Sequence, residues 1–260
     1  MDRERGPAAA IRRAGSLALI TGLTGLTGLA LAGCQATGAA SPGTTASASA
    51  SPGLSVPGTH RATTTYQITS RVSTVVVVSH VGNVTVTGGS GPAISVTQQA
   101  YYSKTPPATT RTVSGKTLTI TYSCPAQLVC GVAYTLAVPR SMALRVTAGA
   151  GAVRLAGLAW TVTAKVDVGL ISATGLTSAS VSLSTRVGGI SASFAAAPAT
   201  VQASARVGAI RLHVPGTAAY RVNANAHVGK ATVSTRQSSS SAHVITATTD
   251  VGAILVAPLS

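Results

Sequence analysis

The sequence predicts an all-β protein in the form of a β-solenoid, a chain that coils into stacked repeats of short strands. Three observations favour this fold. A Val-Gly dipeptide recurs at a nearly constant interval, apolar and polar residues alternate on both sides of its glycine, and no segment after the N-terminus shows a sustained helical apolar stripe. A fixed period of about 20 residues is typical of solenoids, whose repeats bury their apolar face only against a neighbouring repeat.

The glycine of this dipeptide, here called the corner glycine, divides each repeat into two strands. The corner glycines are Gly82, Gly151, Gly169, Gly188, Gly208, Gly229 and Gly252. From Gly151 onward they are spaced 18 to 23 residues apart, and all but Gly151, which follows Ala150, are preceded by valine. Because the apolar alternation changes phase at each of them, we expect a sharp corner with φ > 0, which glycine adopts without a Cβ clash.

The strand before each corner is expected to turn the seventh, fifth and first residues before the glycine into the core. In one central repeat these residues are Val181, Leu183 and Val187. The strand after the corner is expected to bury the second and fourth residues after the glycine, in the same repeat Ile190 and Ala192. This two-residue period is that of a strand with one buried face.

The predicted core is narrow and aliphatic. Aromatic residues make up only 3% of the chain, with one Trp and one Phe, and small aliphatic side chains suit a thin solenoid cross-section. Residues 59–260 are predicted to form one solenoid domain. The less regular region 59–140 is expected to cap one end, and Val251–Ser260 to finish the other.

The first 58 residues are expected to stand outside this domain. Residues 1–33 resemble a bacterial lipoprotein signal peptide, with a basic start, an apolar stretch and Leu31-Ala32-Gly33 directly before Cys34. Cys34 is therefore the expected lipidation site, and an ordinary secretion signal or a membrane anchor is the alternative. Residues 34–58 are uncharged and rich in Ser, Thr, Ala and Pro. They are expected to form a flexible tether at the extracellular face of the cell membrane.

The other two cysteines, Cys124 and Cys130, are expected to form a disulfide. An even pair so close together in an exported chain most simply closes a small loop. A metal or redox pair is the alternative, but the C-x5-C spacing is not that of a thioredoxin-type motif and no histidine lies nearby in the sequence.

Several segments resemble a known family, the adhesin-like domains of unknown function of the DUF4097 type, in the setting of an actinobacterial lipoprotein. The similar text is Cys130-Gly-Val-Ala-Tyr-Thr-Leu-Ala-Val-Pro139, then Leu144–Leu158, then the recurring Val-Gly-x-Ile corners, and it covers about residues 70–257. The resemblance implies a right-handed β-solenoid at the cell surface. Its motifs are specific for a fold and not for a chemistry.

The charge balance favours an anionic partner. The chain has 19 Lys and Arg against four Asp and Glu, a formal charge of +15. Four of the basic and two of the acidic residues lie within residues 1–33, which leaves +13 after removal of that segment. Anionic cell-wall polymers or lipid headgroups are the expected partners. Nucleic acid would also suit the positive charge as a partner. It is disfavoured because the sequence shows no recognition helix and has too few aromatic rings for base stacking.

Charged or titratable side chains recur at one position of the repeat. The residue two before the corner glycine is charged or titratable in five successive repeats: Asp167, Arg186, Arg206, His227 and Asp250. These residues, here called the charge ladder, are expected to lie about 4.8 Å apart on the outer surface. Arg186 and Arg206 are therefore candidates for a polyanion-binding strip. The alternative is that exposed ion pairs, such as Asp167 with Arg186 and His227 with Asp250, keep the strands in register.

An enzyme is disfavoured, and neither a cofactor nor a metal site is expected. Polysaccharide-cleaving β-helix enzymes need paired carboxylates or a carboxylate cluster, whereas only Asp167 and Asp250 remain after residue 33. No G-x-S-x-G motif and no H-x-x-x-H spacing occurs. The sequence therefore favours a non-enzymatic binding or scaffold module. An envelope sensor or assembly protein that binds an unidentified protein partner is the alternative.

Overall fold

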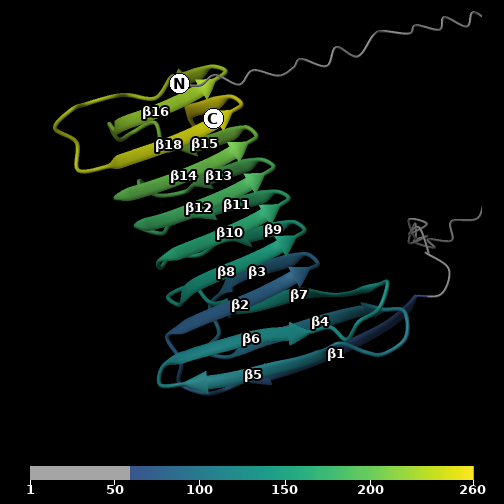
Figure 1. Ribbon diagram of the computed structural model, residues 1–260. Coiled ribbons are helices and arrows are strands. Elements are labelled where there is room, and N and C mark those ends of the chain that lie inside the picture. Colours follow the sequence, from purple (N-terminus) through teal and green to yellow (C-terminus); the bar gives the residue numbers. More distant parts are fainter. Residues whose placement is uncertain (1–58, 260) are drawn as a thin grey trace, which may run out of the picture. The chain divides into compact units, whose positions relative to one another are not determined.

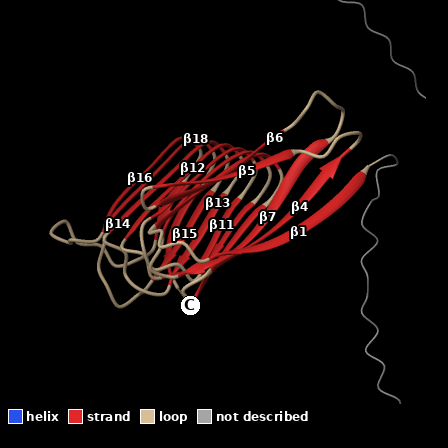
Figure 2. Ribbon diagram, turned by 90° about the horizontal axis from the view of Figure 1, so that it is seen from below, coloured by secondary structure: helices blue, strands red, loops and turns tan. Residues whose placement is uncertain are grey.

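The computed structural model describes residues 59–259, and this part of the chain is entirely β. Figure 2 shows strands and loops and no helix, and nothing within 59–259 is therefore a helix long and apolar enough to cross a membrane. The all-β prediction is confirmed. The predictions of a signal peptide, of lipidation at Cys34 and of a tether over 34–58 lie outside the described residues.

The strands form two sheets. The ten-stranded sheet holds, in spatial order, β1 (His60–Ile68), β4 (Ile94–Tyr102), β7 (Cys130–Pro139), β3 (Val84–Gly89), β9 (Val153–Ala156), β11 (Ile171–Leu176), β13 (Ile190–Phe194), β15 (Ile210–Val214), β19 (Ile254–Pro258) and β17 (Ala231–Val233). The nine-stranded sheet holds β16 (Arg221–Val228), β18 (Val244–Val251), β14 (Thr200–Val207), β12 (Ser180–Val187), β10 (Val162–Val168), β8 (Ala143–Ala150), β2 (Thr74–Val81), β6 (Thr117–Ser123) and β5 (Ala108–Ser114).

Each corner glycine joins a strand of the nine-stranded sheet to a strand of the ten-stranded sheet, and we call such a pair a rung. Neighbouring rungs stack in parallel and in register, so that Val181 of β12 lies between Val162 of β10 and Val201 of β14 (Figure 1). All seven corner glycines have φ between 129° and 150°. The predicted left-handed corners are therefore confirmed.

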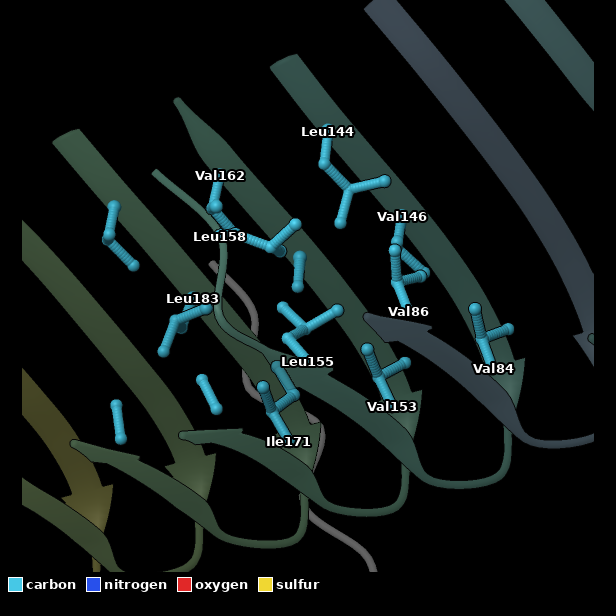
Figure 3. Close-up of a cluster of buried hydrophobic side chains, with 14 of the residues drawn as sticks. Val84, Val86, Leu144, Val146, Val153, Leu155, Leu158, Val162, Ile171 and Leu183 are labelled. Atoms are coloured by element: carbon cyan, nitrogen blue, oxygen red, sulfur yellow. The ribbon is translucent and has the colours of Figure 1, made fainter. Parts of the chain in front are cut away.

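Aliphatic side chains from the two sheets meet between them. Figure 3 shows Leu144, Val146 and Val162 of the nine-stranded sheet opposite Val153 and Leu155 of the other, and all five are buried. The predicted core positions seven and five residues before the corner, and two and four after it, are buried in every rung except β16–β17. A core of this kind excludes water by close packing of small side chains.

The prediction for the residue directly before the corner glycine is wrong. Val187 and its equivalents point outward and are 44–61% exposed. The in-register pairing of β10 with β12 passes from Val166 and Thr185 to Val168 and Val187 and skips the residue between them. The alternation therefore breaks just before each corner. The third residue before the glycine, such as Thr185, is the last buried one.

The order of the rungs at the C-terminal end also differs from the prediction. β18 lies between β14 and β16, and β19 lies between β15 and β17. The chain therefore skips one rung position, forms the end rung β16–β17, and returns to fill the gap. Val251–Ser260 does not finish the array as expected. β16 and β17 are the edge strands.

The region 59–140 lies at the opposite end, as expected. There the sheets end in antiparallel strands, β4 between β1 and β7 in one sheet and β5 on β6 in the other. Cys124 and Cys130 are joined by the predicted disulfide, which closes the loop between β6 and β7.

Candidate functional site

The charge ladder is the strongest candidate site from the sequence, and the structure assembles it. Strand pairing places its members in the spatial order Asp167, Arg186, Arg206, Asp250 and His227, on β10, β12, β14, β18 and β16. All five side chains are partly or fully exposed. The expectation of an outer row of charges is confirmed.

The row contains one ion pair and a second contact that is ionic only when His227 is protonated. The Arg186 Nη2 atom lies 3.3 Å from Asp167 Oδ1, and His227 Nδ1 lies 3.5 Å from Asp250 Oδ1. Both pairs are the ones expected from the repeat. Because all four side chains are largely exposed to water, each pair contributes only a few tenths of a kcal/mol to stability.

The neighbour of Arg206 differs from the expectation. Since β18 is inserted beside β14, Asp250 lies in register next to Arg206 as well as next to His227. In the order of the chain, His227 follows Arg206 in the ladder, and Asp167 is the only acid in a repeat next to either arginine. In the folded chain each arginine has the other arginine on one neighbouring strand and an aspartate on the other neighbouring strand. The two positive and two negative charges therefore balance along the row.

A shallow groove of about 360 Å³ runs along the ladder. Besides Asp167, Arg186, Arg206 and Asp250, its polar lining includes Lys165, Ser184, Ser204 and Thr248. Sequence reasoning missed these four residues, although they share one repeat position, four residues before the corner glycine. The groove therefore offers alternating charges and hydroxyl groups on an open surface.

The arrangement of the two carboxylates does not suit acid–base catalysis. Asp167 and Asp250 are three strands apart with both arginines between them, which corresponds to about 14 Å at a strand spacing of about 4.8 Å. Glycosidases hold their two carboxyl groups within about 10 Å of each other. Within residues 59–259, no group of three His, Cys, Asp or Glu side chains comes together as metal ligands do.

Tyr101 and Tyr102 do not form one paired surface for stacking on a sugar. Tyr101 and Tyr102 are consecutive in β4 and therefore point to opposite faces of the sheet. The Arg61 guanidinium lies 5.4 Å from the centroid of the Tyr101 ring, and His60 stacks on Tyr102. Their contacts with β1 fit a structural role at this end of the array.

A second group of tyrosines lies at the same end, where Tyr122 and Tyr134 are buried and Tyr66 is partly buried. Burial raises the pKa of the Tyr134 hydroxyl far above its usual range, and the nearby Tyr66 and Tyr122 add to the shift. Burial also raises the pKa of Tyr66, partly offset by the positive charge of Arg111, which lies over its ring at 4.1 Å. The hydroxyl groups of Tyr134 and Tyr66 therefore stay protonated at neutral pH.

Comparison with known proteins gives matches among solved structures alone. No protein-family model matches the chain, and no curated protein matches its sequence. A solved "putative cell adhesion protein" from Clostridium sporogenes is similar over 77% of this chain and 100% of its own, with 14% identity and a TM-score of 0.43. A "putative adhesin" from Bacteroides fragilis is similar over 76% and 97%, with 12% identity and a TM-score of 0.35. Another from Parabacteroides merdae is similar over 76% and 96%, with 10% identity and a TM-score of 0.34.

Proposed function

We propose that this chain is a non-enzymatic, lipid-anchored surface protein whose stacked rungs form a right-handed β-solenoid of the DUF4097 type and bind anionic polymers of the cell envelope. Binding is electrostatic and is spread over the surface. The charge ladder is not its centre, because the ladder carries as many aspartates as arginines.

The observation that supports this proposal is the excess of unpaired cations. Residues 59–259 contain 15 Lys and Arg but only two acids, and within this range Arg186 is the one Lys or Arg side chain in an ion pair. Other cations, such as Arg154 of β9 and Arg211 of β15, stand exposed on the outer face of the ten-stranded sheet. Such a surface attracts polyanions over a distance of about 8 Å at physiological salt.

Two variants separate the ladder from the unpaired cations. Replacing Asp167, Arg186, Arg206 and Asp250 together by Ser leaves the net charge unchanged, so the affinity for a teichoic-type polymer is expected to stay within about twofold. Arg154→Ser with Arg211→Ser removes two unpaired charges and is expected to lower the affinity about fivefold at 0.15 M salt or below. Co-sedimentation over a salt series measures both, with neutral dextran as the control polymer.

The opposite result would identify a specific strip. If the fourfold ladder variant lost binding while the Arg154 and Arg211 variant kept it, Arg186 and Arg206 would be the binding residues. If the parent bound teichoic-type polymer no better than dextran, or with no dependence on salt, the proposed function would be wrong.

The anchor is tested separately at Cys34. Only a cysteine thiol at this position can accept the lipid, so Cys34→Ser is expected to move most of the protein from the membrane fraction to the soluble fraction, or to leave its N-terminal segment unprocessed. Fractionation of the producing cells followed by intact-mass measurement checks this. Processed protein that stays in the membrane fraction despite the substitution would contradict the lipid anchor.

A further inference from the structure

An exposed apolar row follows the corners of the array. Strand pairing places the residue before each corner glycine in one continuous line: Val81, Ala150, Val168, Val187, Val207, Val251 and Val228. We call this line the valine ridge. Its six valines are 44–61% exposed, and Leu170, which follows the corner glycine of β10, is exposed beside them. Six β-branched apolar side chains at one outward repeat position are not explained by the core, because none of them is buried.

The backbone under the ridge is already hydrogen-bonded. The N–H of each corner glycine except Gly229, which is on the end rung, donates to the ridge carbonyl of the next rung, as from Gly169 to Val187 at 2.9 Å and from Gly188 to Val207 at 2.8 Å. At Val81 the Tyr122 hydroxyl accepts from the N–H and donates to the C=O. Between its two ends, the ridge therefore offers side chains to a partner but no free strand edge, which disfavours pairing with an added β-strand there.

The ridge ends at an apolar recess. This recess has a volume of about 350 Å³, and its lining includes Val81, Tyr101, Leu128 and Val129. Leu128 is 98% exposed and lies in the loop closed by the Cys124–Cys130 disulfide. Gln127 fixes that loop, because its side-chain oxygen accepts from the N–H groups of Lys104 and Thr105. The disulfide and these hydrogen bonds therefore constrain the loop that exposes Leu128 at one end of the ridge.

Cations lie on both sides of the ridge. Lys165 is exposed on the side of the nine-stranded sheet, and Arg154, Arg211 and Lys230 are exposed on the side of the ten-stranded sheet. The two aspartates of the described chain are balanced by Arg186 and Arg206 in the ladder. The surroundings of the ridge are therefore positive overall.

We propose that the valine ridge is a membrane-contact line, which inserts its valines and Leu128 at the boundary of headgroups and acyl chains of an anionic bilayer. An apolar strip bordered by Lys and Arg is the pattern of interfacial membrane binding. A second copy of the chain would bring like-charged borders together and is disfavoured. A small apolar ligand does not account for the whole ridge, because a row of exposed valines along seven rungs does not enclose one.

The test uses residues 35–260, which include the compact unit 53–260 and lack the Cys34 lipid site. In the variant, Val168, Val187 and Val207 are each replaced by Thr, which keeps the shape and the β-branching but removes apolar surface. Partitioning onto vesicles of equal parts phosphatidylglycerol and phosphatidylcholine is expected to fall about tenfold. Binding of inorganic polyphosphate, which has no apolar part, is expected to stay unchanged.

Val113→Thr is the matched control. Val113 is also about half exposed but lies on β5, away from the ridge, so its substitution is expected to leave vesicle binding unchanged. Thermal melting of all variants establishes that the fold is intact.

A second readout reports insertion directly. In a Trp160→Phe background, Val187→Trp is expected to shift its fluorescence to the blue on addition of phosphatidylglycerol vesicles. Ser191→Trp, on the outer face of β13, is expected not to shift. The proposal is overturned if the parent binds polyphosphate but not these vesicles, or if the threefold Thr variant binds vesicles like the parent and Val187→Trp shows no shift. Failure to bind polyphosphate would instead count against the polymer-binding proposal alone.

Discussion

Replacing Gly208 by Val is expected to abolish the folded array or to destabilise it by about 4 kcal/mol or more. Gly208 has φ 148°, and a Cβ atom there would lie 1.7 Å from the backbone oxygen of Gly188 on the next rung. Neither backbone can move away, because the Gly188 N–H donates to Val207 O at 2.8 Å. Backbone strain at such a position costs about 1–3 kcal/mol by itself, and the close approach between rungs adds to it.

Gly189→Ala is the matched control in the same corner. A Cβ atom at Gly189 would meet its nearest neighbours at 3.4 Å, which is ordinary contact, and its φ is not in the left-handed range. Three other repeats carry alanine at this position. Circular dichroism during heating measures both variants. A Gly208→Val protein that melts within a degree of the parent would show that the rungs do not approach as closely as described.

Deleting residues 244–260 is expected to unfold the C-terminal end of the array while the rest remains. The deletion removes β18 and β19, which supply the strand neighbours of β16 and β17. It also removes the buried Ile245, Ile254 and Val256, each worth about 1.5–3 kcal/mol of burial. Hydrogen exchange should therefore lose protection across β16 and β17, and trypsin should cleave within this segment.

The same deletion discriminates between two rung orders. If β16 stacked directly on β14, as the order of the sequence suggests, its amides would stay protected after residues 244–260 are removed. Deletion of residues 259–260 alone is the control. It leaves both strands intact and is expected to change the exchange pattern only near Val214, whose carbonyl accepts from the Leu259 N–H in the full chain.

The charge ladder shows how far sequence reasoning reached at the candidate site. Its five residues, their exposure and both ion pairs follow from a repeat position and the strand spacing. The neighbour of Arg206 did not follow, because contact between rungs depends on stacking order and not on chain order. This one difference favours the register-keeping alternative, because each of the two adjacent arginines has an aspartate on the neighbouring strand.

The valine ridge was visible in the sequence and was misinterpreted. Strict alternation would place the residue directly before the corner glycine on the same side of the strand as the buried residues seven and five positions before that glycine. A strand that approaches a corner must rotate, and here the residues one and two before the glycine both turn to solvent. The recurrence of valine in six repeats was the available signal, and only its solvent exposure in the fold indicates a partner instead of a core.

The sequence by itself determined the all-β class, the corner positions, the main core rows and the disulfide. Each of these depends on local chemistry that repeats along the chain: the two-residue period of a strand, the positive φ that glycine tolerates, and two nearby thiols. The tertiary structure alone decided the place of β18 and β19, the partner of Arg206 and the exposure of the valines. These features depend on which rung packs on which and on how the backbone turns at a corner, and nothing in a periodic sequence distinguishes one rung as a neighbour from another.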